Sequence, residues 1–134
     1  MKKNSSVLAL ALMFVLGVFG CAGNLQNQAG GIKNISQEEF ATIVQEQKAI
    51  VMDVRTPSEI ANGIIKGTTV FADVNGATFA SQIEKLDKSK TYIVYCRSGA
   101  RSSTASDIMI KSGFTKVYNL TGGISNWKGE ISKP

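Results

Sequence analysis

Residues 91–102 read T-Y-I-V-Y-C-R-S-G-A-R-S, and no other stretch of the chain predicts its structure so clearly. The first five residues are β-branched or aromatic and follow a polar run at 88–90, which predicts a buried strand over 91–95. A helix is expected from about Ser102 to Lys111, with Gly113 as the left-handed residue that ends it. The chain therefore passes from a strand to a helix through a short loop that begins at Cys96.

Strands and helices alternate on both sides of this unit. The pattern predicts strands beginning at Ile32 and over 49–54, 68–71 and 116–120. Helix starts are marked by two capping-box patterns, Ser36 with Glu39 and Thr56 with Glu59. Such alternation argues for an α/β domain with a parallel sheet and helices on both faces, whose ligands bind at the carboxyl ends of the strands.

Three further signals complete this pattern. Pro57 stands at the first position of the second helix, and Gly63 is expected to end it. The apolar spacing of Phe79, Ile83 and Leu86 predicts another helix. After a Gly-Gly turn at 122–123, a short helix carries Trp127, whose ring we expect in the core.

Composition limits the chemistry. The chain has 134 residues, 15 Lys plus Arg, 10 Asp plus Glu, two Cys and no His, which fits one domain. Without His there is no Ser-His-Asp triad, no Cys-His dyad and no His-ligated metal, and two Cys cannot build a four-thiolate zinc site. We expect no metal and no cofactor. No Lys/Arg cluster suggests nucleic-acid binding.

The first residues have the pattern of an export signal. Lys2 and Lys3 precede residues 7–20, which carry no charge and are too short for a stable transmembrane helix. The run ends V-F-G-C at 18–21, which resembles the lipobox of bacterial lipoproteins. The resemblance implies a signal peptide over 1–20 and lipidation of Cys21, with an ordinary secretory signal or an uncleaved anchor as alternatives.

This prediction divides the chain into three parts. Residues 21–31 are small and polar and predict a flexible tether, and residues 32–134 form the domain. The domain would then stand outside the cytoplasm in the cell envelope, lipid-anchored to a membrane, on the periplasmic side in a Gram-negative cell.

The loop after the 91–95 strand has the composition of an anion site. Backbone N–H groups at the start of a helix can converge on one point, and Gly99 permits the turn that this needs. A thiol at such a place, next to Arg97 and Arg101, has a lowered pKa and serves as a nucleophile. The alternative is that Cys96 is a small buried apolar residue.

The chain resembles the rhodanese-like sulfurtransferases. Cys-x-x-Gly-x-Arg at 96–101 is similar to the active loop of that family, and D-V-R-T-P-S-E at 53–59 is similar to a second motif. G-F-x-x-V at 113–117 and L-x-G-G-x-x-x-W at 120–127 match the closing motifs. The segment at 63–68 lacks the His and Pro that the family often has there. The resemblance implies a single domain with a central parallel five-stranded sheet.

The resemblance also implies site roles. Cys96 would take sulfane sulfur from thiosulfate or a persulfide and pass it to cyanide or a thiol. The loop from Arg97 to Ser102 would bind the substrate, with Arg101 on the donor's sulfonate. Asp53 and Arg55 would support the site from behind. The substrate-binding loop residues are Arg97, Ser98, Gly99, Ala100, Arg101 and Ser102.

Three alternatives share this loop. The domain could carry persulfide sulfur without turnover, or Cys96 could be a redox sensor, although a sensor often has a second Cys nearby. Phosphatases of the same fold resemble Cys-x5-Arg, and this loop is one residue shorter, which disfavours phosphate.

Overall fold

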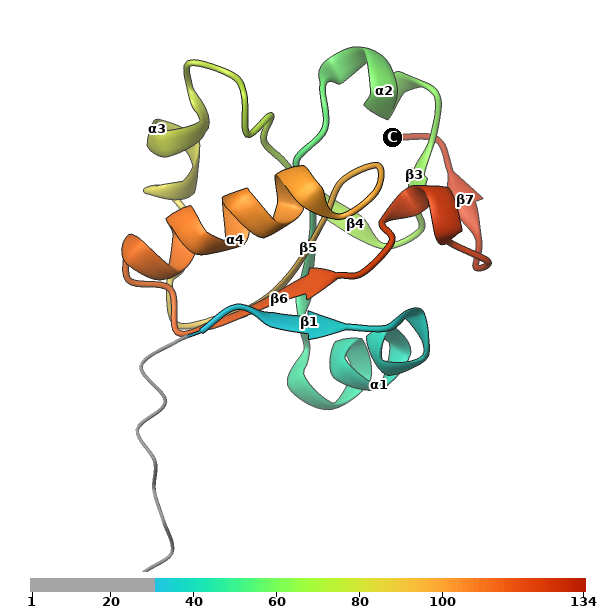
Figure 1. Ribbon diagram of the computed structural model, residues 1–134, viewed down its shortest axis with the longest axis horizontal. Helices are drawn as coiled ribbons and strands as arrows, with labels where there is room; N and C mark the ends of the chain where they lie inside the picture. Colours follow the sequence, from blue (N-terminus) through green and yellow to red (C-terminus); the bar gives the residue numbers. More distant parts are fainter. Residues whose placement is uncertain (1–30) are drawn as a thin grey trace, which may run out of the picture.

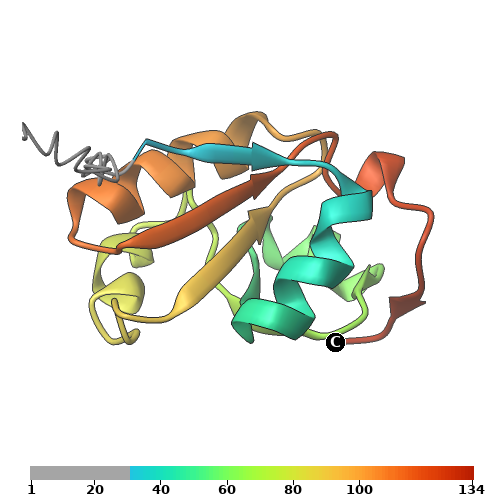
Figure 2. The ribbon, with the colours of Figure 1, turned by 90° about the horizontal axis from the view of Figure 1, so that it is seen from below.

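Strand β5 (Thr91–Tyr95) runs through the centre of a five-stranded sheet. The strand order is β1-β6-β5-β2-β4, and every neighbouring pair is parallel. Figure 2 shows the arrowheads of β1, β6 and β5 pointing the same way. The other four strands are β1 (Lys33–Ile35), β2 (Ile50–Asp53), β4 (Thr68–Phe71) and β6 (Lys116–Leu120). The predicted five-stranded parallel sheet is therefore confirmed.

The computed structural model describes residues 31–134. The predictions for the signal peptide, for lipidation of Cys21 and for the tether up to residue 30 lie outside the described residues. Among residues 31–134, no helix combines the length and the apolar character needed to cross a membrane.

Side chains of β5 alternate between two cores. Tyr92 and Val94 lie in a cluster with side chains of α3 (Phe79–Ile83) and α4 (Ala100–Lys111), on one face of the sheet. Ile93 and Tyr95 belong to the opposite cluster, with α1 (Gln37–Gln47). Figure 1 shows α4 and α1 on opposite sides of the sheet. Because both faces are covered, the strand is apolar throughout, as is usual for a central parallel strand.

The predicted helix starts are confirmed. Ser36 caps α1 and Thr56 caps α2 (Pro57–Ala61), each in a complete capping box with the Glu three residues later. Pro57 stands in the first turn of α2, and Gly113 adopts the expected positive φ of 100° beyond α4. The short helix before Trp127 is a 3-10 turn, η1 (Ile124–Asn126).

Some boundaries differ from the prediction. Helix α4 begins at Ala100, two residues earlier than expected, because Gly99 takes φ 108° at the N-cap and starts the helix there. Helix α3 ends at Ile83, and Leu86 packs against the core from the turn that follows. The antiparallel pair of β3 (Ile64–Ile65) and β7 (Ile131–Ser132) was not predicted, because strands of two residues show no periodicity.

Candidate active site

Cys96 stands directly after β5, and only 1% of its surface is exposed. It is the free cysteine of the described residues. The next three residues turn the chain, and α4 starts at once with its N-terminus facing the loop. The thiol is therefore buried at the carboxyl end of the central strand, where a parallel sheet binds its ligands.

Hydrogen bonds converge on the sulfur. The backbone N–H of Gly99 donates to Sγ at 3.1 Å, and the Ser102 hydroxyl lies 3.4 Å from it. Burial by itself would raise the pKa of Cys96, but bonds from the Ser102 side chain and from loop N–H groups outweigh it and lower the pKa. The predicted direction is confirmed. The largest causes of the lowering are hydrogen bonds to the thiolate from Ser102 and the loop, and the positive charge of Arg101 acts on the same sulfur.

Arg101 reaches across to a different helix. Its Nη1 and Nη2 each donate to one carboxylate oxygen of Glu59 at 2.8 Å, forming a bidentate pair between α4 and α2. This pair lowers the pKa of Glu59 to about 2. Among the described residues, the Nε of Arg101 makes no hydrogen bond. One edge of the guanidinium is therefore occupied, while the other edge is available to an anion.

Asp53 and Arg55 form a buried pair beneath the loop. Arg55 Nη2 lies 2.7 Å from an Asp53 oxygen, and the two side chains are 6% and 0% exposed. Arg55 also donates to the backbone oxygen of Gly63 at 2.8 Å. Its guanidinium lies 5.8 Å from the centre of the ring of Tyr95, the residue before Cys96. These contacts fix the position of the Asp53–Arg55 pair below the loop, and none of them is with the sulfur of Cys96.

The segment after β6 braces the loop from the other side. The backbone N–H groups of Ile124 and Ser125 donate to the carbonyl oxygens of Cys96 and Arg97 at 3.0 and 2.9 Å. Gly123 lies so close that an added Cβ would stand 2.4 Å from the Cys96 oxygen. The turn before η1 therefore holds the loop's carbonyls outward, which leaves its N–H groups turned toward the sulfur.

The structure brings the predicted loop residues together around Sγ, although not equally. Ser102 is fully buried and Gly99 touches the sulfur, whereas the side chains of Arg97, Ser98 and Ala100 are exposed. Trp127 packs edge-on against Phe40, with ring centres 4.8 Å apart, but it is half-buried and covers the edge of the core rather than lying inside it.

Sequence reasoning missed three contributors. Glu59 was recognised as a cap but not as the partner of Arg101, 42 residues away. Asn119 of β6 accepts a hydrogen bond from Ser102 at 2.6 Å. Its signal was an amide beside Leu120 at the end of a predicted strand, where a buried side chain needs hydrogen-bond partners. The third contributor is the segment at 123–125 that holds the loop carbonyls, and its only signal in the sequence was the Gly-Gly pair at 122–123.

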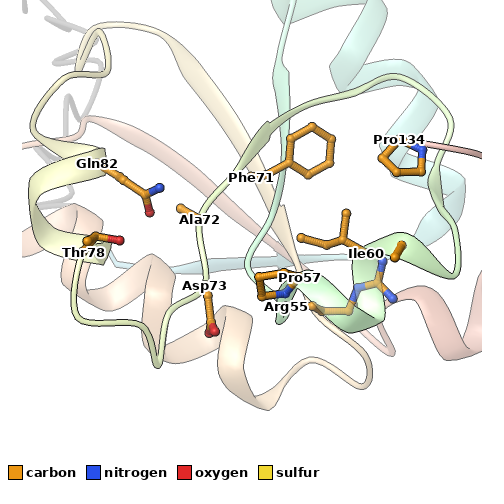
Figure 3. Close-up of a pocket in the computed structure, with 10 residues that line it drawn as sticks. Arg55, Pro57, Ile60, Phe71, Ala72, Asp73, Thr78, Gln82 and Pro134 are labelled. Atoms are coloured by element: carbon orange, nitrogen blue, oxygen red, sulfur yellow. The ribbon is translucent and has the colours of Figure 1, made fainter.

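A cavity of about 380 Å³ lies beyond the carboxyl end of β4, beside α2. Figure 3 shows Phe71, Ile60 and Pro134 on one side of it, and Asp73, Thr78 and Gln82 on the other. Cys96 does not line it. Within residues 31–134 no cluster of three His, Cys, Asp or Glu side chains could hold a metal ion.

A buried thiol in a strand–loop–helix cradle defines the class of the domain, and comparison with known proteins gives the family. The rhodanese-like domain family matches residues 36–130. The chain belongs to the rhodanese-like family.

Curated relatives include sulfurtransferases. The chain is 36% identical over 90 residues to a thiosulfate sulfurtransferase of Pseudomonas fluorescens, which covers 67% of this chain and 80% of that protein. It is 32% identical over 97 residues to a sulfurtransferase of Allochromatium vinosum, covering 72% and 88%. A tRNA uridine(34) hydroxylase of Pelagibacter ubique is 31% identical over 100 residues, but the match covers 33% of that longer protein and 75% of this chain.

Solved structures agree on the fold. The structure of a rhodanese-like domain protein from Staphylococcus aureus superposes with a TM-score of 0.66 at 25% identity, and the match covers 77% of this chain and 99% of that one.

Proposed function

We propose that this domain is a sulfurtransferase that moves sulfane sulfur from an anionic donor, such as thiosulfate, to cyanide or a thiol through a persulfide on Cys96. The observation that carries the proposal is the cradle around Sγ, with the Gly99 N–H at 3.1 Å and the Ser102 hydroxyl at 3.4 Å. Such a cradle favours the thiolate, which is the reactive form of a cysteine.

The first step loads the enzyme. The Cys96 thiolate attacks the outer sulfur of thiosulfate, a new S–S bond forms, and the S–S bond of the donor breaks. The bonding electron pair leaves with sulfite, and the negative charge moves to the outer sulfur of the persulfide. No proton is transferred, so a chain without His has all that the step needs.

The second step unloads the enzyme. Cyanide attacks the outer sulfur, the persulfide S–S bond breaks, and its electron pair returns to Sγ as thiolate while thiocyanate leaves. A thiolate acceptor would instead leave as a persulfide. In both steps the loop N–H groups lie near the charge, as donors do in an oxyanion hole.

Arg101 suits the donor's sulfonate. Its pair with Glu59 uses Nη1 and Nη2 and fixes the orientation of the guanidinium, and its Nε edge stays available. Arg97 is exposed beside the loop and adds a second positive charge. Together they would attract an anion toward a sulfur that is itself negative.

The test uses the full chain carrying Cys21→Ser, so that Cys96 is the one remaining thiol. The protein is incubated with thiosulfate, its intact mass is recorded before and after cyanide, and thiocyanate is assayed. We expect a gain of one sulfur atom, its removal by cyanide and repeated turnover. Cys96→Ser in the same background must lose all three, and full activity in that variant would rule the proposal out.

The same experiment has to distinguish the sulfurtransferase from a sulfur carrier that does not turn over. The carrier role uses the same thiol and the same loop, so the site geometry is common to both functions. Sulfur that loads from a donor but is not turned over on cyanide would identify the domain as a carrier.

We also propose that the domain works in the cell envelope, held by a lipid on Cys21. The sequence pattern at 18–21 is the support for this. Fractionation of cells that express the full chain, with the intact mass of the membrane-bound form, tests it. The chain should be found with membranes, should lack residues 1–20 and should carry the mass of a lipid that Cys21→Ser abolishes. A membrane-bound chain without that added mass would rule out lipidation.

A further inference from the structure

A chain of polar side chains leads away from the nucleophile through the sheet. The Ser102 Oγ lies 3.4 Å from Cys96 Sγ and 2.6 Å from Asn119 Oδ1. Asn119 Nδ2 in turn donates to Asn34 Oδ1 at 2.9 Å. The register of the sheet produces this arrangement, because Asn34 of β1 and Asn119 of β6 stand directly opposite each other.

The two central residues of this hydrogen-bond network, Ser102 and Asn119, are buried. Ser102 is 0% exposed and Asn119 is 5% exposed, so water does not readily replace either partner. Val117, two residues before Asn119, lies in the apolar core under α4. The Asn119 amide lies on the same face of β6 as Val117, at the carboxyl end of the strand, close to the sulfur of Cys96.

The hydroxyl has one proton and three acceptors. Besides Sγ and the Asn119 oxygen, the Gly99 carbonyl oxygen lies 3.1 Å from Ser102 Oγ. A hydroxyl donates one hydrogen bond at a time. The shortest contact is with Asn119, whose amide is held in the accepting orientation by its own bond to Asn34. The Ser102 hydroxyl therefore has to give up its hydrogen bond to Asn119 before it can donate one to the sulfur.

We propose that Asn119 is a positioning residue for Cys96: its Oδ1 accepts the hydrogen bond of the Ser102 hydroxyl while the sulfur is uncharged, and the hydroxyl turns to donate to Sγ when the thiolate forms, with its proton staying on Ser102 throughout. The persulfide stage of this inference rests on the proposed function. When negative charge moves to the outer sulfur, the hydroxyl turns back to Asn119. The sulfur then gains a donor only in the state that carries charge on Sγ, and the hydroxyl has an acceptor in every state.

The test measures the rate of iodoacetamide alkylation of Cys96 against pH, in the full chain carrying Cys21→Ser. Asn119→Leu keeps the size of the side chain and removes the competing acceptor. The apparent pKa of Cys96 should then fall by about 0.5 to 1 unit, as one hydrogen bond would allow. The charged group that acts on this sulfur is Arg101 of α4, paired with Glu59 of α2, and the variants leave both unchanged.

The second arm asks whether Ser102 transmits the effect. Ser102→Ala should raise the apparent pKa of Cys96, and Asn119→Leu should then have no further effect. Val117→Ala is the matched control, since it alters the same face of β6 but removes no hydrogen bond of the Ser102 hydroxyl, and it should leave the profile unchanged. An unchanged or raised pKa in Asn119→Leu, or an equal shift without Ser102, would overturn the proposal.

Asn34→Ala keeps the test valid if Asn119→Leu does not fold, because Asn34 is exposed. It frees the Asn119 amide to turn its NH2 group toward Ser102, so the pKa of Cys96 should fall in the same direction and by less. No shift would overturn the proposal. Alkylation needs no sulfur donor, so a failure to load sulfur would count against the proposed function and not against the role of Asn119.

Discussion

Arg101 and Glu59 join the first turns of two helices through a bidentate ion pair, with both N–O distances 2.8 Å. Both side chains are 28% exposed, so the pair is partly screened from water. Glu59 at the same time accepts from the backbone N–H of Thr56 at 3.1 Å, as the partner of that N-cap residue in the capping box of α2. One carboxylate therefore fixes the start of α2 and the side chain of Arg101.

Glu59→Gln should reduce stability. It removes a charge-assisted fork and weakens the capping box, which together should cost about 1–3 kcal/mol. Urea unfolding at neutral pH measures the free energy of unfolding. Asp107→Asn is the matched control, because its pair with Lys111 is far more exposed and should be worth less than about 0.5 kcal/mol. Equal losses in the two variants would contradict this reading of the pair.

The contribution of Glu59 should depend on pH. Since the fold lowers its pKa from 4.5 to about 2, the stabilisation is fully present above pH 4.5 and is lost as pH falls toward 2. The difference in unfolding free energy between the native chain and Glu59→Gln should therefore be constant near neutrality and shrink below pH 4.5. A constant difference down to pH 2 would mean that the carboxylate charge does not contribute.

Arg101 should select for anionic reagents. In the Cys21→Ser background, Arg101→Ala should slow the reaction of Cys96 with iodoacetate about ten times more than its reaction with neutral iodoacetamide. The ratio of the two rates cancels any change in thiolate fraction. Equal slowing of both reagents would show that Arg101 shapes the loop without binding the anion.

Gly123→Ala should damage the loop specifically. A Cβ there would meet the carbonyl oxygens of Cys96 and Arg97 at 2.4 and 2.6 Å, so the loop has to shift. We expect sulfur loading to fall by at least about tenfold, given the cost of displaced catalytic groups. Gly67→Ala is the control: Gly67 has φ 93° but no neighbour within 4 Å. It should lose about 1 kcal/mol of stability and keep its loading rate.

Asp53→Asn should be the most destabilising of these changes. It leaves the Arg55 guanidinium, 6% exposed, without its carboxylate. Removing one partner of a buried ion pair typically costs about 3–5 kcal/mol. Urea unfolding of Asp53→Asn and of the double variant Asp53→Asn/Arg55→Met measures this cost. The double variant should be the more stable of the two, and the reverse order would mean that Arg55 contributes by other contacts.

The sequence carried most of the fold because its signals are local. The strand at 91–95 and the capping boxes at Ser36 and Thr56 each depend on residues close together in the sequence, and the structure contains all three. The thiol and its loop were readable for the same reason. Pairings such as Arg101 with Glu59 depend on which strands lie side by side, and no periodicity in the chain contains that information.

The cause of the lowered pKa of Cys96 shows the same limit. Charge at Arg97 and Arg101 is visible in the sequence, whereas the direction of an N–H or a hydroxyl is not. The donor that matters most among those that lower the pKa is Ser102, and its other contact comes from Asn119 on a later strand.

The brace at residues 123–125 has a consequence for the order in which a working site is made. The N–H groups of Ile124 and Ser125 hold the carbonyl oxygens of Cys96 and Arg97, although they lie beyond the next helix and strand of the chain. A fragment that ends before Gly123 would keep the thiol and every loop residue but would lose the two bonds that orient the loop carbonyls. The cradle therefore forms only when a later segment of the chain has folded against the loop.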